Sequence, residues 1–310
     1  MKILVTGGAG FIGSHVAEAF QQAGHEVHVL DDLSSGRREN VPPGVVLHVM
    51  DIRSGEVEEL WAEHGFEVLC HHAAQMDVRR SVSDPLFDAE VNVLGTLRLL
   101  EAGRKHGLRK VIFASTGGAI YGEPEYVPQD EDHPVRPVSP YGVTKLAGEK
   151  YLHYYYVQYG IPYVALRYAN VYGPRQNPHG EAGVVAIFLE RILRGQQPII
   201  YGDGRQTRDF TYVEDVVRAN MLALAYPEPD VFNVGTGQET DVLSLFRLIC
   251  QATGSDIPEV HGPPRPGEQR RSVLGYKKIR DRMGWEPSVS LQEGIARTAA
   301  YFRQQLAQSV

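Results

Sequence analysis

The sequence predicts an α/β fold with a doubly wound parallel sheet followed by a smaller second domain. Over the first 170 residues, short runs rich in Val and Ile alternate with longer amphipathic segments. The short runs are apolar on both faces, which is typical of strands buried between two helix layers. Beyond residue 173 this alternation loosens, and Pro, Gly and charged residues become more frequent. Regular alternation followed by an irregular region indicates a parallel sheet first and a second domain after it.

The individual elements follow from the same periodicity. Strands are expected at Ile3–Val5, Val27–Leu30, Val45–Val49, Val68–Cys70, Val111–Ala114, Tyr163–Leu166 and Val231–Val234. Helices are expected at Phe11–Ala23, Glu56–Glu63, Asp88–His106, Tyr141–Tyr159, Val184–Arg194, Val213–Tyr226, Leu243–Ala252 and Leu291–Gln304. Because the last of these strands would return to the sheet, we predict a first domain of residues 1–172 plus about 207–238. Residues 173–206 and 239–310 would then form the second domain.

Composition narrows the function classes. Of the 310 residues, 43% are hydrophobic and 22% are charged, and the formal net charge is −7. This balance is that of an ordinary globular protein, and a negative surplus argues against a nucleic-acid partner. No run approaches the roughly 20 apolar residues of a membrane span, and the first residues do not resemble a signal peptide. We therefore expect a cytoplasmic protein with neither a nucleic-acid nor a membrane partner.

Metal binding is not expected from the motifs that stand out. The two cysteines, Cys70 and Cys250, are 180 positions apart, which argues against a disulfide framework or a cysteine zinc site. His71 and His72 are adjacent in a predicted strand, so their side chains should point to opposite faces of the sheet.

A glycine-rich turn directly after the first strand predicts a dinucleotide site. Thr6–Gly13 contains G-x-G-x-x-G and opens a predicted helix, where a side chain would hold a pyrophosphate away from the backbone N–H groups. Asp31 ends the next strand, 18 positions after Gly13, where an acid binds a ribose 2′-hydroxyl and repels a 2′-phosphate. The preferred cofactor is therefore NAD. The residues expected to contact it in this region are Gly7, Gly10, Phe11, Ile12, Gly13, Asp31, Asp32, Asp51 and Ile52.

A second constellation predicts acid–base chemistry. Tyr141 and Lys145 form Tyr-x-x-x-Lys at the start of a helix, a spacing that puts both side chains on one helical face. A phenol has a pKa of about 10, so a nearby ammonium group and an oxidised nicotinamide would be needed to favour the phenolate at neutral pH. Ser115 and Thr116 end the preceding strand, at the sheet edge where ligands bind. Three further residues are expected at the same edge: Ala73, Ala74 and Asn92.

Together these motifs resemble the extended short-chain dehydrogenase/reductases over essentially the whole chain. The resemblance rests on the glycine turn, on Asp31, on His72-Ala73-Ala74 and on a Thr-Tyr-Lys set whose Thr116 lies 25 positions before Tyr141. It further rests on the segment Arg167–Pro174, on Gly202-Asp203-Gly204 and on Arg208-Asp209-Phe210. It implies a Rossmann-type sheet with a C-terminal substrate-binding domain, bound NAD, and Thr116, Tyr141 and Lys145 as catalytic residues. It also implies cofactor contacts from His72, Ala73, Ala74, Gln75, Asn92, Ser115, Tyr141, Lys145 and Tyr168.

The same resemblance implies a nucleotide-sugar site. An arginine would bind the diphosphate and an aromatic residue would border the uridine pocket. A small residue four positions after Glu268, here Ser272, would leave room for an N-acetyl group on carbon 2 of the sugar. The expected substrate-binding residues are Thr116, Tyr141, Asn170, Arg208, Phe210, Arg265, Glu268 and Ser272. The chain departs from the family pattern at Gly275–Lys278, where the family often has Asp-x-Ser/Thr-Lys-Ala.

Within this family the chain is similar to the branch that interconverts UDP-galactose and UDP-glucose through a 4-keto sugar. Gly117-Gly118 follow Thr116 where dehydratases carry an Asp-Glu pair, which argues against water elimination. The alternatives are epimerisation of UDP-N-acetylglucosamine or UDP-glucuronate, decarboxylation of UDP-glucuronate, and, from a different class, a non-catalytic NAD-dependent sensor. Interconversion of UDP-galactose and UDP-glucose would place the protein in galactose metabolism.

A tyrosine-rich helix suggests a covered surface. At helical spacing, Tyr151, Tyr155 and Tyr159 form one stripe. A base-stacking platform for nucleic acid is disfavoured by the net negative charge. The resemblance implies instead a homodimer in which this helix and the one predicted at Asp88–His106 form the interface.

Overall fold

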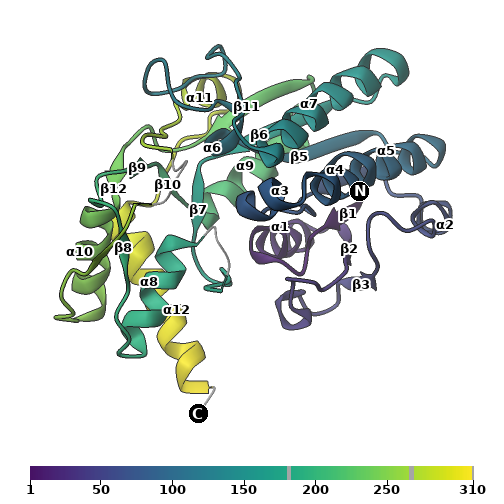
Figure 1. Ribbon diagram of the computed structural model, residues 1–310. Coiled ribbons are helices and arrows are strands. Elements are labelled where there is room, and N and C mark those ends of the chain that lie inside the picture. Colours follow the sequence, from purple (N-terminus) through teal and green to yellow (C-terminus); the bar gives the residue numbers. More distant parts are fainter. Residues whose placement is uncertain (180–182, 265–268, 309–310) are drawn as a thin grey trace. The chain divides into compact units, whose positions relative to one another are not determined.

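The computed structural model describes residues 1–179, 183–264 and 269–308 and divides into two compact units (Figure 1). The first unit contains Met1–Ile120, Pro137–Arg167 and Val217–Phe232. The second contains Tyr121–Arg136, Tyr168–Val216 and Asn233–Val310. The chain therefore passes between the units several times rather than completing one before starting the other.

A seven-stranded sheet forms the centre of the first unit, in the order β11-β6-β5-β4-β1-β2-β3. Pairing is parallel between β1 and β2, β2 and β3, β1 and β4, and β4 and β5. The strand bounds are β1 Lys2–Thr6, β2 Glu26–Asp31, β3 Val46–Val49, β4 Val68–His71, β5 Lys110–Thr116, β6 Tyr163–Tyr168 and β11 Asp230–Val234. This order reverses direction between β1 and β4, which is the switch point where doubly wound sheets bind ligands. The predicted fold class is confirmed.

Helices cover both faces of this sheet. Side chains of alternate strand positions, such as Leu4 and Leu69, join one core with Trp61, Leu99 and Leu152 from three helices. On the other face, Cys70 contacts Asn220 of α9, at an Sγ–Oδ1 distance of 3.8 Å. The helices are α1 Phe11–Gln22, α2 Val57–His64, α3 Val78–Ser83, α4 Pro85–Ala89, α5 Thr96–Lys105, α6 Gly117–Ile120, α7 Pro140–Tyr159 and α9 Val213–Ala225. The short 3₁₀ helix η1 spans Arg38–Asn40.

One predicted helix is interrupted. The sequence predicts a single helix over Asp88–His106, but a π-helix, η2, spans Glu90–Gly95 between α4 and α5. Its wider turn leaves Asn92 and Gly95 buried, and Ile52 packs so closely on Gly95 that a Cβ there would lie 2.7 Å from its Cδ1. A continuous 3.6-residue pattern does not reveal such a bulge, and π-bulges are frequent at functional sites.

The second unit combines short paired strands with three helices that pack on one another, α8, α10 and α12. Its strand pairs are parallel for β7 with β10 and β8 with β13, and antiparallel for β9 with β12. Its strands are β7 Asn170–Tyr172, β8 Ile200–Tyr201, β9 Thr207–Arg208, β10 Phe210–Tyr212, β12 Thr240–Asp241 and β13 His261–Gly262. Its helices are α8 Val184–Leu193, α10 Val242–Thr253, α11 Lys277–Met283 and α12 Leu291–Gln308.

Two buried carboxylates organise the irregular parts of the second unit. Asp209 accepts hydrogen bonds from the backbone N–H groups of Thr236, Gly237 and Leu274 at 2.9–3.2 Å. Asp215 accepts from the N–H and hydroxyl of Ser288, the latter at 2.7 Å. Asp209 therefore ties distant segments to the junction between β9 and β10, and Asp215 ties one to α9, a role usually filled by sheet hydrogen bonds.

A buried ion pair ties α7 to β6 in the first unit. The guanidinium of Arg167 donates to both carboxylate oxygens of Glu149, at 2.9 and 2.6 Å, and both side chains are at most 7% exposed. The hydroxyl of Ser115 donates to the same carboxylate at 2.6 Å. The pair thus joins a helix and two strands below the predicted catalytic residues.

Among the residues that the structure describes, no helix has both the length and the apolar character needed to cross a membrane.

Replacing Glu149 with alanine should strongly destabilise the protein. The change leaves the Arg167 guanidinium buried without its carboxylate, a loss that typically reduces the free energy of unfolding by about 3–5 kcal/mol. Urea unfolding followed by circular dichroism measures it.

Lys105→Ala is the matched control, because Lys105 forms an ion pair with Glu58 at 3.0 Å in which both side chains are more than 40% exposed. It should leave the urea midpoint almost unchanged. Equal midpoint shifts for the two variants would contradict a stabilising role of the buried pair.

Candidate active site

The glycine-rich turn brings three backbone segments into close contact. Gly7 has a φ of 67°, and a Cβ at this position would lie 2.7 Å from the backbone nitrogen of Ala73. A Cβ at Gly13 would lie 2.2 Å from the carbonyl oxygen of Gly7. These two positions admit only glycine, because the first helix, the turn and the end of β4 approach one another too closely for any side chain.

The turn presents the N-terminus of α1 with its backbone donors available. Gly10 is the N-cap and supplies no side-chain hydrogen bond, and the first turn of α1 contains no acidic residue. Phe11 and Ile12 open the helix. The free N–H groups and the helix dipole together form an anion site of the kind that holds a pyrophosphate. These residues fit the predicted dinucleotide.

Asp31 lies at the end of β2 and braces the turn. Its carboxylate accepts a hydrogen bond from the N–H of Ala9 at 3.0 Å and another from Leu33 at 2.9 Å. Burial raises its pKa above the ordinary value, although these hydrogen bonds act in the opposite direction. Each oxygen keeps a further acceptor position for a ribose hydroxyl. Asp32, in contrast, is exposed and binds Ser34 at 2.6 Å.

Asp51 and Ile52 follow β3, and only Ile52 is buried in the core. The Asp51 carboxylate accepts three hydrogen bonds of 2.7–3.2 Å from the Arg53 guanidinium, which hold the pKa of Asp51 below its usual value. Ile52 is 5% exposed and belongs to the hydrophobic core beside Gly95. A polar role at this position would therefore fall to Asp51.

The segment after β4 is held by buried side chains. Ala73 donates its N–H to the hydroxyl of Thr6 at 3.2 Å, and the carboxamide of Asn92 binds both the N–H and the carbonyl of Gln75, at 2.8 and 2.9 Å. Burial lowers the pKa of His72 to about 3, so its imidazole is neutral. Ala74 lies in the same segment. The predicted residues after β4 are thus ordered without any bound molecule.

A buried carboxylate that the sequence analysis missed lies at the centre of this network. Asp88 is fully buried and accepts hydrogen bonds from the side chains of Gln75, Asn92 and Thr144 at 2.8–3.2 Å. Thr144 lies in the first turns of α7, directly before Lys145. Asp88 therefore fixes the start of α7 relative to η2 and the segment after β4.

Two glycines bring α7 against β5 and α6. A Cβ at Gly142 would lie 2.4 Å from the carbonyl oxygen of Ala119, and one at Gly148 would lie 2.6 Å from the ring of Phe113. Thr116 ends β5, and Ala119 follows it in α6. The close packing therefore places the helix that carries Tyr141 directly against the element that follows Thr116.

Lys145 is buried beneath the sheet edge. Its ammonium donates to the carbonyl oxygen of Ala114 at 2.9 Å and lies 4.9 Å from the centre of the Phe113 ring. Burial lowers the pKa of Lys145 to about 8, and the carboxylates of Asp88 and Glu149 act in the opposite direction. A lysine in this state carries its charge at neutral pH and loses it readily at alkaline pH.

The pKa of Tyr141 is not lowered as expected from a nearby ammonium group. Burial, together with the negative charge of Asp88, raises the pKa of this phenol above its ordinary value. The chain alone therefore favours the neutral phenol. The Ser115 hydroxyl, one residue before Thr116, donates to Glu149 as described above and so turns toward the core.

The predicted substrate-binding residues other than Thr116 and Tyr141 belong to the second unit. The guanidinium of Arg208 donates to the backbone carbonyl of Gln269 at 2.9 Å. Phe210 is 6% exposed and pairs with Asn170 between β10 and β7. Ser272 and Tyr168 are also buried, at 2% and 6% exposure. The predicted residues Arg265 and Glu268 lie outside the part of the chain that the structure describes.

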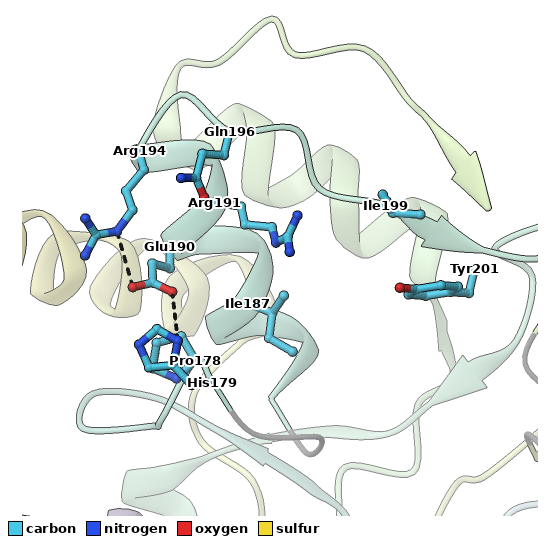
Figure 2. Close-up of a pocket in the computed structure, with 9 residues that line it drawn as sticks. All are labelled: Pro178, His179, Ile187, Glu190, Arg191, Arg194, Gln196, Ile199 and Tyr201. Carbon is cyan, nitrogen blue, oxygen red and sulfur yellow. Dashed lines mark hydrogen bonds and ion pairs between the residues drawn. The ribbon is translucent and has the colours of Figure 1, made fainter.

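A cavity of about 540 Å³ lies elsewhere in the second unit (Figure 2). The Glu190 carboxylate at its wall lies between Arg194, at 3.3 Å, and His179, at 3.8 Å. None of the site residues predicted from the sequence lines it. The lining residues are Pro178, His179, Ile187, Glu190, Arg191, Arg194, Gln196, Ile199 and Tyr201.

Comparison with known proteins decides the family. Residues 3–235 match the model of the NAD dependent epimerase/dehydratase family. The chain belongs to this family. The family resemblance and the NAD cofactor predicted from the glycine turn and Asp31 are thereby confirmed.

Individual members of the family are similar over nearly the full chain. A UDP-glucose 4-epimerase of Mycolicibacterium smegmatis is 49% identical over 310 residues, covering 98% of this chain and 99% of the relative. A crystal structure of the Thermotoga maritima UDP-glucose 4-epimerase with UDP-glucose is 50% identical and has a TM-score of 0.97, covering 99% of this chain and 100% of that one. The Thermus thermophilus UDP-glucose 4-epimerase, in complex with NAD, is 50% identical and has a TM-score of 0.93, covering 98% and 99%.

Two buried carboxylates, Asp88 and Asp209, were not among the predicted site residues, yet Asp88 holds two predicted site residues in place and Asp209 holds two distant segments of the second unit. Asp88 precedes the π-helix, and Asp209 stands inside the Arg-Asp-Phe motif between two residues that were assigned to substrate. A carboxylate on an amphipathic helix ordinarily faces solvent, so the sequence around Asp88 does not indicate that this residue is buried. For Asp209 the one weak indication of a role in the site is its place between Arg208 and Phe210.

Asp88→Asn should change the pH dependence of the protein's catalytic reaction. The Asp88 carboxylate raises the pKa of Lys145, so removing this charge should lower that pKa below about 8. Activity that requires the Lys145 ammonium should then decline at a lower pH than in the unmodified protein. A pH profile of kcat measures the shift.

Glu90→Gln is the control for this profile, because Glu90 is an exposed carboxylate on the adjacent π-helix and pairs with Arg53 at 3.5 Å. It should leave the alkaline limb unchanged. An alkaline limb that is the same in all three proteins would refute the electrostatic role of Asp88.

Proposed function

We propose that this protein is a UDP-glucose 4-epimerase, which interconverts UDP-galactose and UDP-glucose with tightly bound NAD. The observation that supports the proposal is the close packing of α7, which carries Tyr141 and Lys145, against β5, which ends at Thr116, and against α6. The nearly full-length similarity to UDP-glucose 4-epimerases supports the same reaction.

The first unit supplies the proposed cofactor site. Gly7, Gly10 and Gly13 let the backbone approach the pyrophosphate, and the N–H groups of Phe11 and Ile12 donate to it. Asp31 accepts hydrogen bonds from the adenosine ribose, and Asp51 lies on the adenine side. Asp32 lies next to Asp31, and Ile52 is assigned with Asp51 to the adenine side. The other assigned cofactor contacts are His72, Ala73, Ala74, Gln75, Asn92, Ser115 and, from the second unit, Tyr168. When bound, an oxidised nicotinamide supplies a hydride acceptor and a positive charge.

The acid–base step is assigned to three residues. The Tyr141 phenolate removes the proton of the sugar 4-hydroxyl and returns it later to the opposite epimer. Lys145 stabilises the phenolate by its charge from the same face of α7. The Thr116 hydroxyl donates a hydrogen bond to the reacting oxygen. Because burial raises the pKa of Tyr141 in the chain alone, this assignment requires positive charge at the site when the proton is removed.

The second unit is proposed to bind the nucleotide sugar. Arg208 would contact the diphosphate, Phe210 would border the uridine, and Asn170 would bind the sugar. Arg265 and Glu268 are assigned to phosphate and ribose from the sequence motif. We propose residues 1–172 with about 207–238 as the cofactor domain and residues 173–206 with 239–310 as the substrate domain, with Asn170, Arg208 and Phe210 of the first range extending the substrate site.

The absence of an acid and a second base after Thr116 separates this proposal from the other family reactions. Gly117 and Gly118 begin α6, and neither can take part in proton transfer. Dehydration and decarboxylation each require a further acidic side chain at this point. A sensor without catalysis would not need the complete Thr-Tyr-Lys set.

A homodimer in the cytoplasm completes the proposal. Tyr151 and Tyr154 of α7 are 38% and 48% exposed, and Leu94 on η2 is 58% exposed, so apolar surface lies on both predicted interface segments. Tyr155, the middle residue of the stripe, packs within the chain instead, where its hydroxyl donates to Glu101 at 2.6 Å. Sedimentation velocity of the purified protein tests the dimer.

The purified protein should convert UDP-galactose to UDP-glucose without added cofactor. The reaction consumes no net reductant, so bound NAD is regenerated in each turnover. A coupled assay for UDP-glucose measures activity, and acid release followed by chromatography identifies the bound nucleotide. Activity that depends strictly on added NADP would overturn the role given to Asp31.

Tyr141→Phe should keep the fold and NAD binding but lower kcat by at least ~10²-fold, the lower end of the range for loss of a positioned acid–base group. Lys145→Met should reduce kcat similarly, while its melting temperature should equal or exceed that of the unmodified protein, because a buried ammonium is removed. Thr116→Val should cost less, since it removes one hydrogen bond. Near-normal turnover in Tyr141→Phe would disprove the mechanism.

UDP-N-acetylglucosamine should be a second substrate. The feature that favours it is the small side chain of Ser272, at the position that the family resemblance places beside carbon 2 of the sugar; Ser272 is buried, at 2% exposure. Ser272→Tyr should suppress turnover of the N-acetyl sugar and leave UDP-galactose conversion largely intact, with the melting temperature as a control for folding. No N-acetyl turnover in the unmodified protein, or an equal loss of both activities in the variant, would refute the assignment of Ser272.

A further inference from the structure

Three histidine side chains gather at the β3 edge of the central sheet, and none of them is assigned to the proposed cofactor or substrate site. His28 lies on β2, His48 on β3, and His64 ends α2. One ring nitrogen of each lies within 4.8 Å of a ring nitrogen of the other two. Nδ1 of His28 is 2.9 Å from Nε2 of His48. We refer to these three residues as the histidine trio.

Strand register explains why the trio shares one face. His48 pairs with Leu30 across β2 and β3, and His28 pairs with Val46. Residues two apart on a strand point to the same side of the sheet, so His28 and His48 are diagonal neighbours on one face. Their rings stack with centres 5.2 Å apart and planes 13° from parallel. The last residue of α2 completes the group, with the His64 ring centre 4.7 Å from His28 and 5.1 Å from His48.

A carboxylate lies behind the most buried member of the trio. His28 is 5% exposed, and its Nε2 is 3.4 Å from Oε1 of Glu26. A proton on Nε2, shared with this carboxylate, leaves the lone pair of Nδ1 directed toward His48. Histidines that bind metals commonly donate their other ring N–H to a carboxylate in this way. Two further charges lie near the trio, the Glu63 carboxylate beside His48 and the Lys2 ammonium, which pairs with Glu26 at 3.2 Å.

We propose that the histidine trio binds one divalent transition-metal ion, with Zn²⁺ as its representative. Neutral imidazoles are the ligands that Zn²⁺, Ni²⁺ and Cu²⁺ share, and three of them leave one position of a tetrahedral zinc for water. Zinc–nitrogen bonds of about 2.0–2.1 Å place tetrahedral ligand nitrogens roughly 3.4 Å apart. The nitrogens of the trio lie between 2.9 and 4.8 Å apart, so small side-chain rotations suffice to reach this spacing.

The position of the trio at the sheet edge indicates a structural role for the bound ion. Within the part of the chain that the structure describes, β3 is the last strand of the sheet and pairs with β2 alone. The ion would link this edge strand and its hydrogen-bonded neighbour β2 to the end of α2, where the His64 ring contacts the rings of His28 and His48. It therefore stabilises the edge of the first unit and takes no part in the reaction, so its removal should leave UDP-sugar turnover unchanged.

Zinc titration of the protein tests the site directly. The full chain, purified without a polyhistidine tag and stripped with a chelator, is titrated with ZnCl₂ by isothermal calorimetry. We expect one ion per chain and a zinc-dependent rise in melting temperature. His48→Gln and His64→Gln should each weaken binding by more than the roughly 10- to 100-fold that loss of an outer partner costs, and Glu26→Gln should weaken it within that range.

His106→Gln is the matched control. It removes another partly exposed imidazole of the same unit, which lies 3.8 Å from Glu58, and it should bind zinc as the unmodified protein does. Absence of zinc binding, or equal affinity in His48→Gln and His106→Gln, would overturn the proposal. X-ray absorption of the zinc-loaded unmodified protein decides the matter even if a variant fails to fold. Three nitrogen ligands at about 2.0–2.1 Å support the site, and fewer than three refute it.

Discussion

The distance between helix α7 and strand β5 is the constraint on which the catalytic arrangement depends. Tyr141 and Lys145 lie on the helix and Thr116 ends the strand, so their relation is fixed only if the two elements cannot separate. Gly142 and Gly148 remove the side chains that would hold the helix away. Asp88 then fixes the first turns of the helix by accepting a hydrogen bond from Thr144. A small change at any of these contacts would move the reacting groups relative to one another, which is costly because catalysis requires near-contact geometry.

Most of the fold could be predicted from the sequence because its strands and helices have strong, distinct periodicities. The seven strands of the sheet all occur where apolar runs indicated them, extended by one or two residues at most ends. The π-helix at Glu90–Gly95 could not be predicted, because inserting one residue per turn does not disturb an apolar pattern enough to be detected. The short strands of the second unit were also missed, since two or three residues carry no periodicity.

The predicted site residues were easier to find than the residues that position them. Glycine turns and Tyr-x-x-x-Lys are local in sequence, so a single segment contains the whole pattern. The partners of Glu149 and Asp209 lie 18 to 65 positions away in the chain, and nothing in a single segment identifies them. The same is true of the histidine trio, whose members become neighbours only through the register of β2 and β3. Ligand-binding residues are therefore easier to predict from a sequence than the residues that hold them in place.

The buried acids also explain how an irregular second unit maintains one conformation. Burial raises the pKa of Asp209 to about 6, yet its carboxylate receives hydrogen bonds from two separate segments. A neutral amide or a hydrophobic side chain could not accept as many backbone donors at once. Burying a charge is unfavourable, but the hydrogen bonds that Asp209 accepts hold the loops of the second unit in one arrangement.

The interleaved order of the two units has a consequence for synthesis on the ribosome. Strand β6 ends at Tyr168, and its sheet neighbour β11 begins at Asp230, 62 positions later (230 − 168). At about 5–20 residues per second, the outer edge of β6 waits roughly 3–12 s for its partner. During that interval its unpaired backbone groups are a template for pairing with other nascent chains. Protection of this edge by a chaperone, or faster synthesis between residues 168 and 230, would therefore limit such pairing and raise the yield of folded protein.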